Sequence, residues 1–98
     1  MQSKWVQIGS VRRFDHVAPD KAQALKPLEE AAEVFGALQS THLPEDRRRE
    51  QILDECADVI QATLNLVAAL GIEDFRPYMK ACELRNRERG RITDGRAE

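Results

Sequence analysis

The chain has 98 residues, a third of them charged, yet its formal net charge at pH 7 is only −2. Such a length suits one domain, residues 1–98, which buries a modest share of its surface. The balanced charge creates no overall field that would attract nucleic acid or an anionic membrane, so we expect neither as a partner. No apolar run approaches the roughly 20 residues of a membrane span. The N-terminus lacks the apolar core segment of a signal peptide.

The two cysteines, Cys56 and Cys82, form no CxxC pair and fall within helical patterns. Cysteines in that setting are usually small, half-buried hydrophobic residues. We therefore expect both to be reduced, as in a cytoplasmic protein.

Residues 1–18 form the least regular part of the sequence. Apolar side chains recur there at every third position and predict a short helix with one apolar stripe: Trp5, Ile8, Val11 and Phe14. Gly9 and Ser10 weaken this pattern.

A longer helix is expected from Pro19–Asp20 to about Gln39, because proline is tolerated in the first turn of a helix. Its helical stripe of apolar residues consists of Leu25, Leu28, Ala32, Phe35 and Leu38. Pro27 falls inside this segment and predicts either a kink or the true start of the helix.

Residues 40–43 predict a connection, and Pro44–Asp46 predict the start of a second long helix with acids in its first turn. This helix is expected to run to Leu70, with Gly71 as its C-terminal cap. Its second half is apolar on several faces, which indicates burial on more than one side. In a chain this short, such burial favours a partner subunit.

A last helix is expected after Asp74 and should end near Arg89–Gly90. The polar tail, residues 92–98, is expected to be loose. The sequence thus predicts an all-α fold, a small helical hairpin or bundle of three or four helices. A four-helix-bundle core would be completed by dimerisation.

Two acidic pairs with the same spacing lie on the two long predicted helices. They are Glu30 with Glu33 and Glu55 with Asp58. Residues three apart share a helix face, so each pair directs two carboxylates the same way. If the helices pack side by side, four carboxylates converge, and a hard divalent cation would offset their repulsion. Glu29 points further round its helix and is expected to be exposed, or to support the other acids without contacting the cation.

The second acidic pair begins a narrow strip along its helix that continues through small or polar residues: Ala62, Asn65 and Ala69. The strip lies among apolar residues, so its acids should be partly shielded from water. Acids at this spacing are common on solvated helix faces. Two matched pairs, one of them within an apolar segment, nevertheless favour a metal site.

The segments KPLEEAAEVFGAL and ILDECADVIQATLNLVAALGI carry an ExxE…ExxD pattern, and LRNRERG follows downstream. In these segments the chain resembles the MazG-like, all-α nucleoside triphosphate pyrophosphohydrolases. The resemblance covers Lys26 to Ile72 and extends to about Gly90. It implies hydrolysis of an NTP or dNTP to the monophosphate and pyrophosphate with Mg²⁺, or Mn²⁺ in its place. It also implies a homodimer or a dimer of dimers.

By this resemblance the metal-binding acids are Glu30, Glu33, Glu55 and Asp58. Substrate-binding roles fall to Lys26, Asn86 and Arg89, with Lys80 a weaker candidate. Catalytic roles fall to Glu33 and Glu55. A carboxylate that the metal does not saturate, such as Glu33, would act as the base, although the sequence leaves the choice of carboxylate open. The cationic groups would offset charge on the phosphate oxygens.

Two other interpretations remain. Phosphoribosyl-ATP pyrophosphohydrolase resembles the chain at KxxEEAAE and ExxD, but the apolar continuation of that enzyme is absent here, where Val-Ile-Gln-Ala follows Asp58. The chain could also be a non-catalytic helical dimer that binds metal through the same acids. The intact set of four acids favours the enzyme.

Overall fold

The computed structural model describes residues 3–93. It contains three helices, α1 (Lys21–Leu38), α2 (Glu45–Ala69) and α3 (Arg76–Glu88), and no strand in that range. The predicted all-α class is therefore confirmed. Most of the tail that was expected to be loose, residues 94–98, lies outside the described residues.

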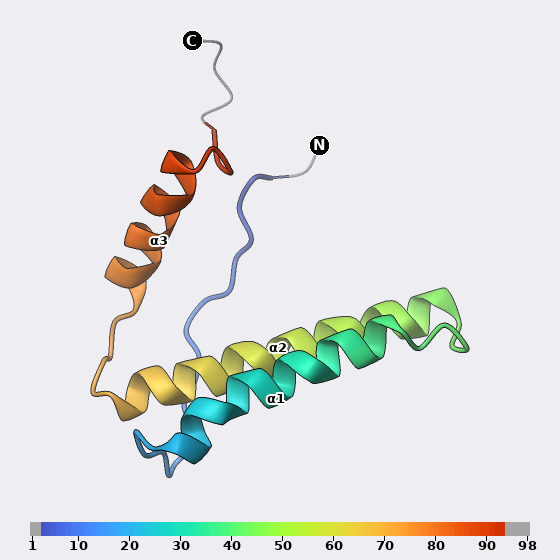
Figure 1. The fold of residues 1–98 in the computed structure, drawn as a ribbon, viewed down its shortest axis with the longest axis horizontal. Helices are drawn as coiled ribbons and strands as arrows, with labels where there is room; N and C mark the ends of the chain where they lie inside the picture. The colour runs from blue at the N-terminus through green and yellow to red at the C-terminus, as the bar shows by residue number, and fades with distance from the viewer. Residues whose placement is uncertain (1–2, 94–98) are drawn as a thin grey trace.

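Helices α1 and α2 lie side by side as an antiparallel hairpin, joined by a short loop (Figure 1). Asp20 caps the start of α1, because its Oδ1 atom accepts a hydrogen bond from the backbone N–H of Gln23 at 2.8 Å. Pro27 lies inside this helix. The alternative in which Pro27 marks the true start is therefore wrong, since the helix already begins at Lys21, directly after the Asp20 cap.

Gly71 caps the C-terminus of α2, as the sequence predicts. Gly71 has a φ of +85°, and its N–H donates to the Ala68 carbonyl at 2.9 Å. The N–H of Ile72 donates to the Val67 carbonyl at 3.3 Å. These two bonds form a Schellman motif, in which glycine is favoured because L side chains rarely adopt a positive φ.

Hydrogen bonds to Asp74 define the start of helix α3. The Asp74 carboxylate accepts hydrogen bonds from the backbone N–H of Arg76 at 3.0 Å and from the Arg76 guanidinium at 2.8 and 2.9 Å. This guanidinium lowers the pKa of the Asp74 carboxyl to about 2. Within the described residues α3 contacts neither α1 nor α2, and it projects away from the hairpin (Figure 1).

The seam between α1 and α2 follows a repeat of four and three residues. On α1 the side chains that are not fully exposed are those of Gln23, Pro27, Glu30, Val34 and Ala37, and on α2 a matching series is Ile52, Glu55, Val59 and Ala62. Such a repeat keeps one stripe of each helix facing its neighbour. Two glutamates thus occupy seam positions where apolar side chains would normally pack.

The apolar stripe that the sequence predicts on α1 is helical but uncovered. Leu28 is 68% exposed and Phe35 is 59% exposed, and Leu25 and Leu38 are also exposed. The whole chain has an accessible surface of 8384 Å², whereas a compact monomer of this mass exposes about 5,700 Å². Its radius of gyration is 16.3 Å, against about 13 Å for a compact domain of this size. A single chain therefore leaves much apolar surface in water.

The helix predicted within residues 1–18 is wrong for the part that the structure describes. Residues 3–20 form an extended segment, here called the N-terminal segment, which crosses α2. The backbone N–H of Phe14 donates to Asn65 Oδ1 at 3.0 Å, and Gln61 Nε2 donates to the Arg12 carbonyl at 3.0 Å. These side chains satisfy backbone groups that a helix would have paired internally.

Two smaller predictions can be compared with the structure. Cys56 and Cys82 are unpaired and half-buried, as expected. Among the described residues, no helix is both long and apolar enough to cross a membrane.

Candidate metal centre

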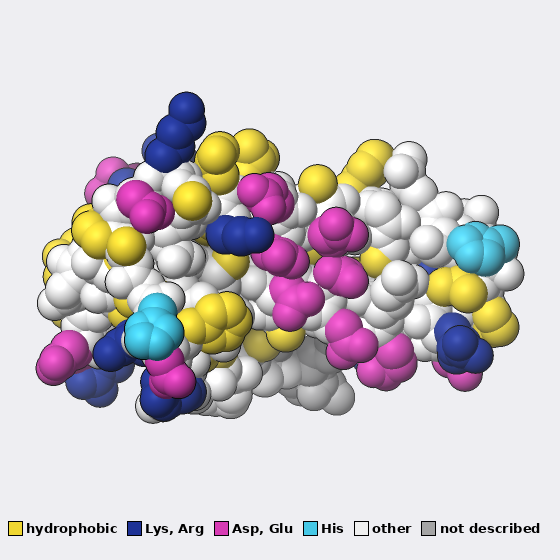
Figure 2. All heavy atoms as spheres, turned by 90° about the horizontal axis from the view of Figure 1, so that it is seen from below, with side chains coloured by type: hydrophobic (Ala, Val, Ile, Leu, Met, Phe, Trp, Pro, Cys, Tyr) yellow, Lys and Arg dark blue, Asp and Glu magenta, His cyan; other side chains and the backbone are white. Residues whose placement is uncertain are grey.

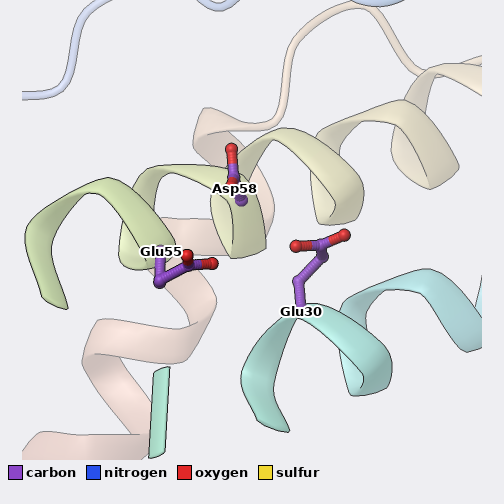
Figure 3. A group of neighbouring side chains, drawn as sticks. All are labelled: Glu30, Glu55 and Asp58. Carbon is purple, nitrogen blue, oxygen red and sulfur yellow. The ribbon is translucent and has the colours of Figure 1, made fainter. Parts of the chain in front are cut away.

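Three carboxylates meet at the seam between α1 and α2. Glu30, Glu55 and Asp58 each place one oxygen within 4.8 Å of the others. Glu30 comes from α1, and the other two come from adjacent turns of α2 (Figure 3). Figure 3 shows the Glu30 carboxylate extending from α1 toward α2. These three residues are here called the acidic group.

The seam repeat explains why these side chains meet. Glu30 and Glu55 occupy equivalent seam positions on the two helices, and both are half-buried. Asp58 lies three residues after Glu55, so it shares the same face of α2, and it is exposed. The acidic group is therefore shielded on the seam side and open toward solvent at Asp58.

Burial and neighbouring negative charge both raise the pKa of the Glu55 carboxyl above its usual 4.5. Burial is the larger cause, and the charges of Asp58, Glu33 and Glu30 follow in that order. Asp54 adds a smaller contribution of the same sign. The charged form of Glu55 is thus disfavoured in the folded chain, and a bound cation would reverse that penalty.

Glu33, the fourth acid of the predicted set, lies near the other three but is not grouped with them. It is exposed and lies outside the acidic group, although its charge is close enough to raise the pKa of Glu55. Figure 2 shows acidic side chains gathered in a band along the middle of one face of the molecule. Glu33 is therefore near the acidic group, with its side chain open to solvent.

Lys26 lies one turn before Glu30 on α1, but its ammonium group pairs with Glu29. The Nζ–Oε2 distance is 3.3 Å, and both side chains are exposed. Glu29 is outside the acidic group, as the sequence predicts. An exposed pair of this kind contributes at most about 1 kcal/mol, so Glu29 holds the Lys26 ammonium group only weakly.

The structure does not bring the remaining predicted substrate-binding residues to the acidic group within one chain. Asn86 and Arg89 lie on or next to the end of α3, which contacts neither α1 nor α2 in the described part. Asn86 Nδ2 donates to the Cys82 carbonyl at 3.0 Å, and Asn86 Oδ1 accepts from Arg91 at 3.1 Å. Lys80, on the same helix, lies 3.8 Å from Glu83.

Gln61 and Asn65 also belong to this region, and sequence reasoning assigned no partner to either. They follow Asp58 by one and two helical turns on α2, and they anchor the N-terminal segment. Asn65 stood out in the sequence as a polar residue in a strip of small ones. Its partner could not be found that way, because it is a backbone N–H at Phe14, 51 positions away.

No protein-family model, curated protein or solved structure matches the chain. The acidic group and its surroundings are therefore the basis for assigning a function.

Proposed function

We propose that the protein is a Mg²⁺-dependent nucleoside triphosphate pyrophosphohydrolase of the MazG-like type, which sanitises or regulates a nucleotide pool. The observation that carries this proposal is the position of Glu30 and Glu55. The carboxylates of Glu30 and Glu55 occupy facing seam positions, where apolar side chains would normally pack, and the Asp58 carboxylate lies beside them. Such a placement raises the free energy of the metal-free fold, so a ligand that offsets it is expected.

The donor set suits Mg²⁺, with Mn²⁺ as an alternative. Both are hard cations that prefer carboxylate oxygens, and Mg²⁺ retains several waters when it binds through a few carboxylates. The acidic group offers three carboxylates and opens to solvent at Asp58, which leaves room for water and phosphate. No histidine or cysteine is among the three, which disfavours zinc.

The acidic group also favours a phosphate substrate. A polyphosphate is strongly anionic and would be repelled by Glu30, Glu55 and Asp58 unless a cation lay between them. When bound, Mg²⁺ polarises phosphate oxygens and activates water. Glu33 is exposed beside the group, where its carboxylate can accept a proton from an attacking water. Lys26 can neutralise a phosphate oxygen once it leaves Glu29.

The same proposal includes a homodimer or a dimer of dimers. The exposed apolar residues of α1, with Leu28 and Phe35 at their centre, would pack against a second copy. Two hairpins joined in this way form a four-helix core, which is the assembly that the sequence predicts.

A panel of nucleotides tests the proposal. Purified protein is incubated with Mg²⁺ and each NTP and dNTP in turn, and pyrophosphate and orthophosphate are measured separately. The proposal predicts pyrophosphate and a monophosphate from at least one nucleotide, and no product when the metal is chelated. Phosphoribosyl-ATP is assayed beside the panel. Release of pyrophosphate from none of these compounds would favour the non-catalytic metal-binding dimer, and turnover of phosphoribosyl-ATP alone would favour phosphoribosyl-ATP pyrophosphohydrolase.

A further inference from the structure

We propose that the cavity between the N-terminal segment and the first two turns of α1 receives the base and sugar of the nucleotide, while the phosphates extend to the acidic group. Gln23 and His16 then determine which nucleoside is accepted. This inference rests on the proposed function, because it concerns the substrate of the same site. It goes further by naming the residues that recognise the part of the substrate that does not react.

The cavity has a volume of about 310 Å³, which is at the lower end of the range for small-molecule sites. One of its walls consists of residues 16–18 of the N-terminal segment, and the other belongs to the start of α1. Such sites usually combine an apolar lining with a few polar groups that orient the ligand. Both kinds are present here: Val17, Ala18 and Ala22 are apolar, and His16, Gln23 and Lys26 are polar.

Gln23 and His16 have hydrogen-bonding groups available for a ligand. Gln23 bonds Asp20 Oδ1 through its backbone N–H, but its half-buried side-chain amide has no partner among the described residues, and neither has the His16 imidazole. Pro27 also has no N–H to donate to the Gln23 carbonyl four residues earlier, which leaves a backbone acceptor beside the amide. An amide and a neutral imidazole each offer a donor and an acceptor, which are the groups that recognise the edge of a base.

Helical spacing connects the cavity to the acidic group. Lys26 lines the cavity and lies one turn before Glu30, while Gln23 lies two turns before Glu30 on the seam. The distance along α1 from Lys26 to Glu30 is only about 6 Å at 1.5 Å per residue. A ligand with an apolar ring at one end and anionic groups at the other can therefore occupy both places. A nucleotide has this division.

Hydrogen bonds fix the wall formed by residues 16–18 at both of its ends. On one side, the Phe14 N–H donates to Asn65 Oδ1 at 3.0 Å and ties the N-terminal segment to α2. On the other, the Asp20 N–H donates to the Ala18 carbonyl at 2.8 Å, and Asp20 caps α1. Figure 1 shows the N-terminal segment passing α2 and then turning into α1. The cavity is therefore formed before a ligand binds, as is usual for small-molecule sites.

Substitution of two lining residues tests the inference through nucleotide preference. Gln23→Ala should lower kcat/KM for the preferred nucleotide about 10-fold and reduce its advantage over the others, because a group that recognises the base is lost. Ala22→Trp should raise KM by filling the cavity. Both variants should keep the wild-type rise in melting temperature with Mg²⁺. Gln51→Ala and Gln51→Trp are the matched controls, since Gln51 is exposed on α2 and outside this cavity. Unchanged KM and nucleotide preference in both lining variants would overturn the inference.

Binding measured without turnover separates the inference from the proposed function. The ¹⁵N-labelled protein with Mg²⁺ is titrated with each common nucleoside 5′-monophosphate and, separately, with inorganic phosphate. The inference predicts that at least one monophosphate shifts the backbone amide signals of residues 16–18 and 22–23, and that phosphate alone does not. No shift in these two segments with any monophosphate would overturn it. Shifts there in a protein that hydrolyses no nucleotide would instead reject the proposed function and leave the nucleoside site standing.

Discussion

Asn65 Oδ1 binds the backbone N–H of Phe14 at 3.0 Å and thereby ties the N-terminal segment to α2. The same oxygen accepts a hydrogen bond from Gln61 Nε2 at 3.0 Å, and Gln61 in turn donates to the Arg12 carbonyl. Asn65 is only 2% exposed. One buried amide therefore organises a contact between two parts of the chain that are far apart in sequence, two helical turns from Asp58.

Asn65→Ala should destabilise the protein by about 1–3 kcal/mol, because the Phe14 N–H loses its partner in a site largely closed to water. Urea unfolding at fixed protein concentration measures this change in the free energy of unfolding. Gln51→Ala is the matched control, since Gln51 is an exposed amide on the same helix. An effect of Asn65→Ala no larger than that of the control would contradict the anchoring role.

Mg²⁺ should stabilise the wild-type protein and have no effect on Glu55→Gln. A ligand that binds only the folded state stabilises it by about 2.7 kcal/mol at a concentration 100 times its Kd. Melting temperature against Mg²⁺ concentration gives this gain directly. Glu50→Gln, on the same helix but outside the acidic group, should respond like the wild type. Equal responses of all three proteins would place the ion elsewhere.

Without metal, Glu55→Gln should be more stable than the wild type at pH 7. The folded pKa of Glu55 is raised above 4.5, so its favourable contribution is complete below that value and is lost as the pH rises through the raised pKa. The glutamine stays neutral and avoids this loss. Melting temperatures in EDTA should therefore differ at pH 7 and converge near pH 4. If Glu55→Gln is less stable than the wild type at pH 7, burial and the neighbouring carboxylates do not disfavour the charged form of Glu55.

The same shift predicts how metal affinity depends on pH. Mg²⁺ binds the carboxylate form, so its affinity should fall as the pH decreases toward the raised pKa of Glu55. Calorimetric titration at pH values from 7.5 down to 5 measures this change, because an ordinary glutamate, with a pKa of about 4.3, stays mostly charged over that range. A constant affinity over the range would mean that Glu55 keeps an ordinary pKa or does not bind the ion.

Phe35→Glu should convert the proposed dimer to monomers, because it places a charge on the exposed apolar stripe of α1. Light scattering after size exclusion measures the mass of the particle against 11.1 kDa for one chain. Val6→Glu is the control, since Val6 is an exposed apolar residue of the N-terminal segment. An unchanged mass for Phe35→Glu would exclude this stripe as the interface.

The sequence predicted the helices well where local chemistry determines their ends. Asp20, Gly71 and Asp74 each satisfy backbone groups of nearby residues, and such contacts are visible in sequence spacing. The N-terminal segment was predicted wrongly for the opposite reason. Its conformation depends on Gln61 and Asn65, about 50 positions away, and no local pattern reports such a contact.

The sequence predicted those parts of the candidate site that depend on helical spacing and missed those that depend on how distant elements pack. Glu30, Glu55 and Asp58 come together because helical spacing and antiparallel packing suffice to align them. The position of α3 relative to the acids depends on the direction of the α2–α3 connection, which spacing does not give. The apolar stripe of α1 was recognised, but its packing partner was not, because periodicity identifies an apolar face without saying which chain covers it.

Hydrolysis in ¹⁸O-labelled water tests the central claim most directly. With Mg²⁺ and the preferred nucleotide, the products are separated and the label is located by mass spectrometry and phosphorus NMR. A pyrophosphohydrolase is expected to yield pyrophosphate and a monophosphate, with the label on one of the two products, and Glu55→Gln should yield neither. Orthophosphate with a diphosphate, or undiminished turnover by Glu55→Gln, would contradict the assignment of the acidic group as the site of this reaction.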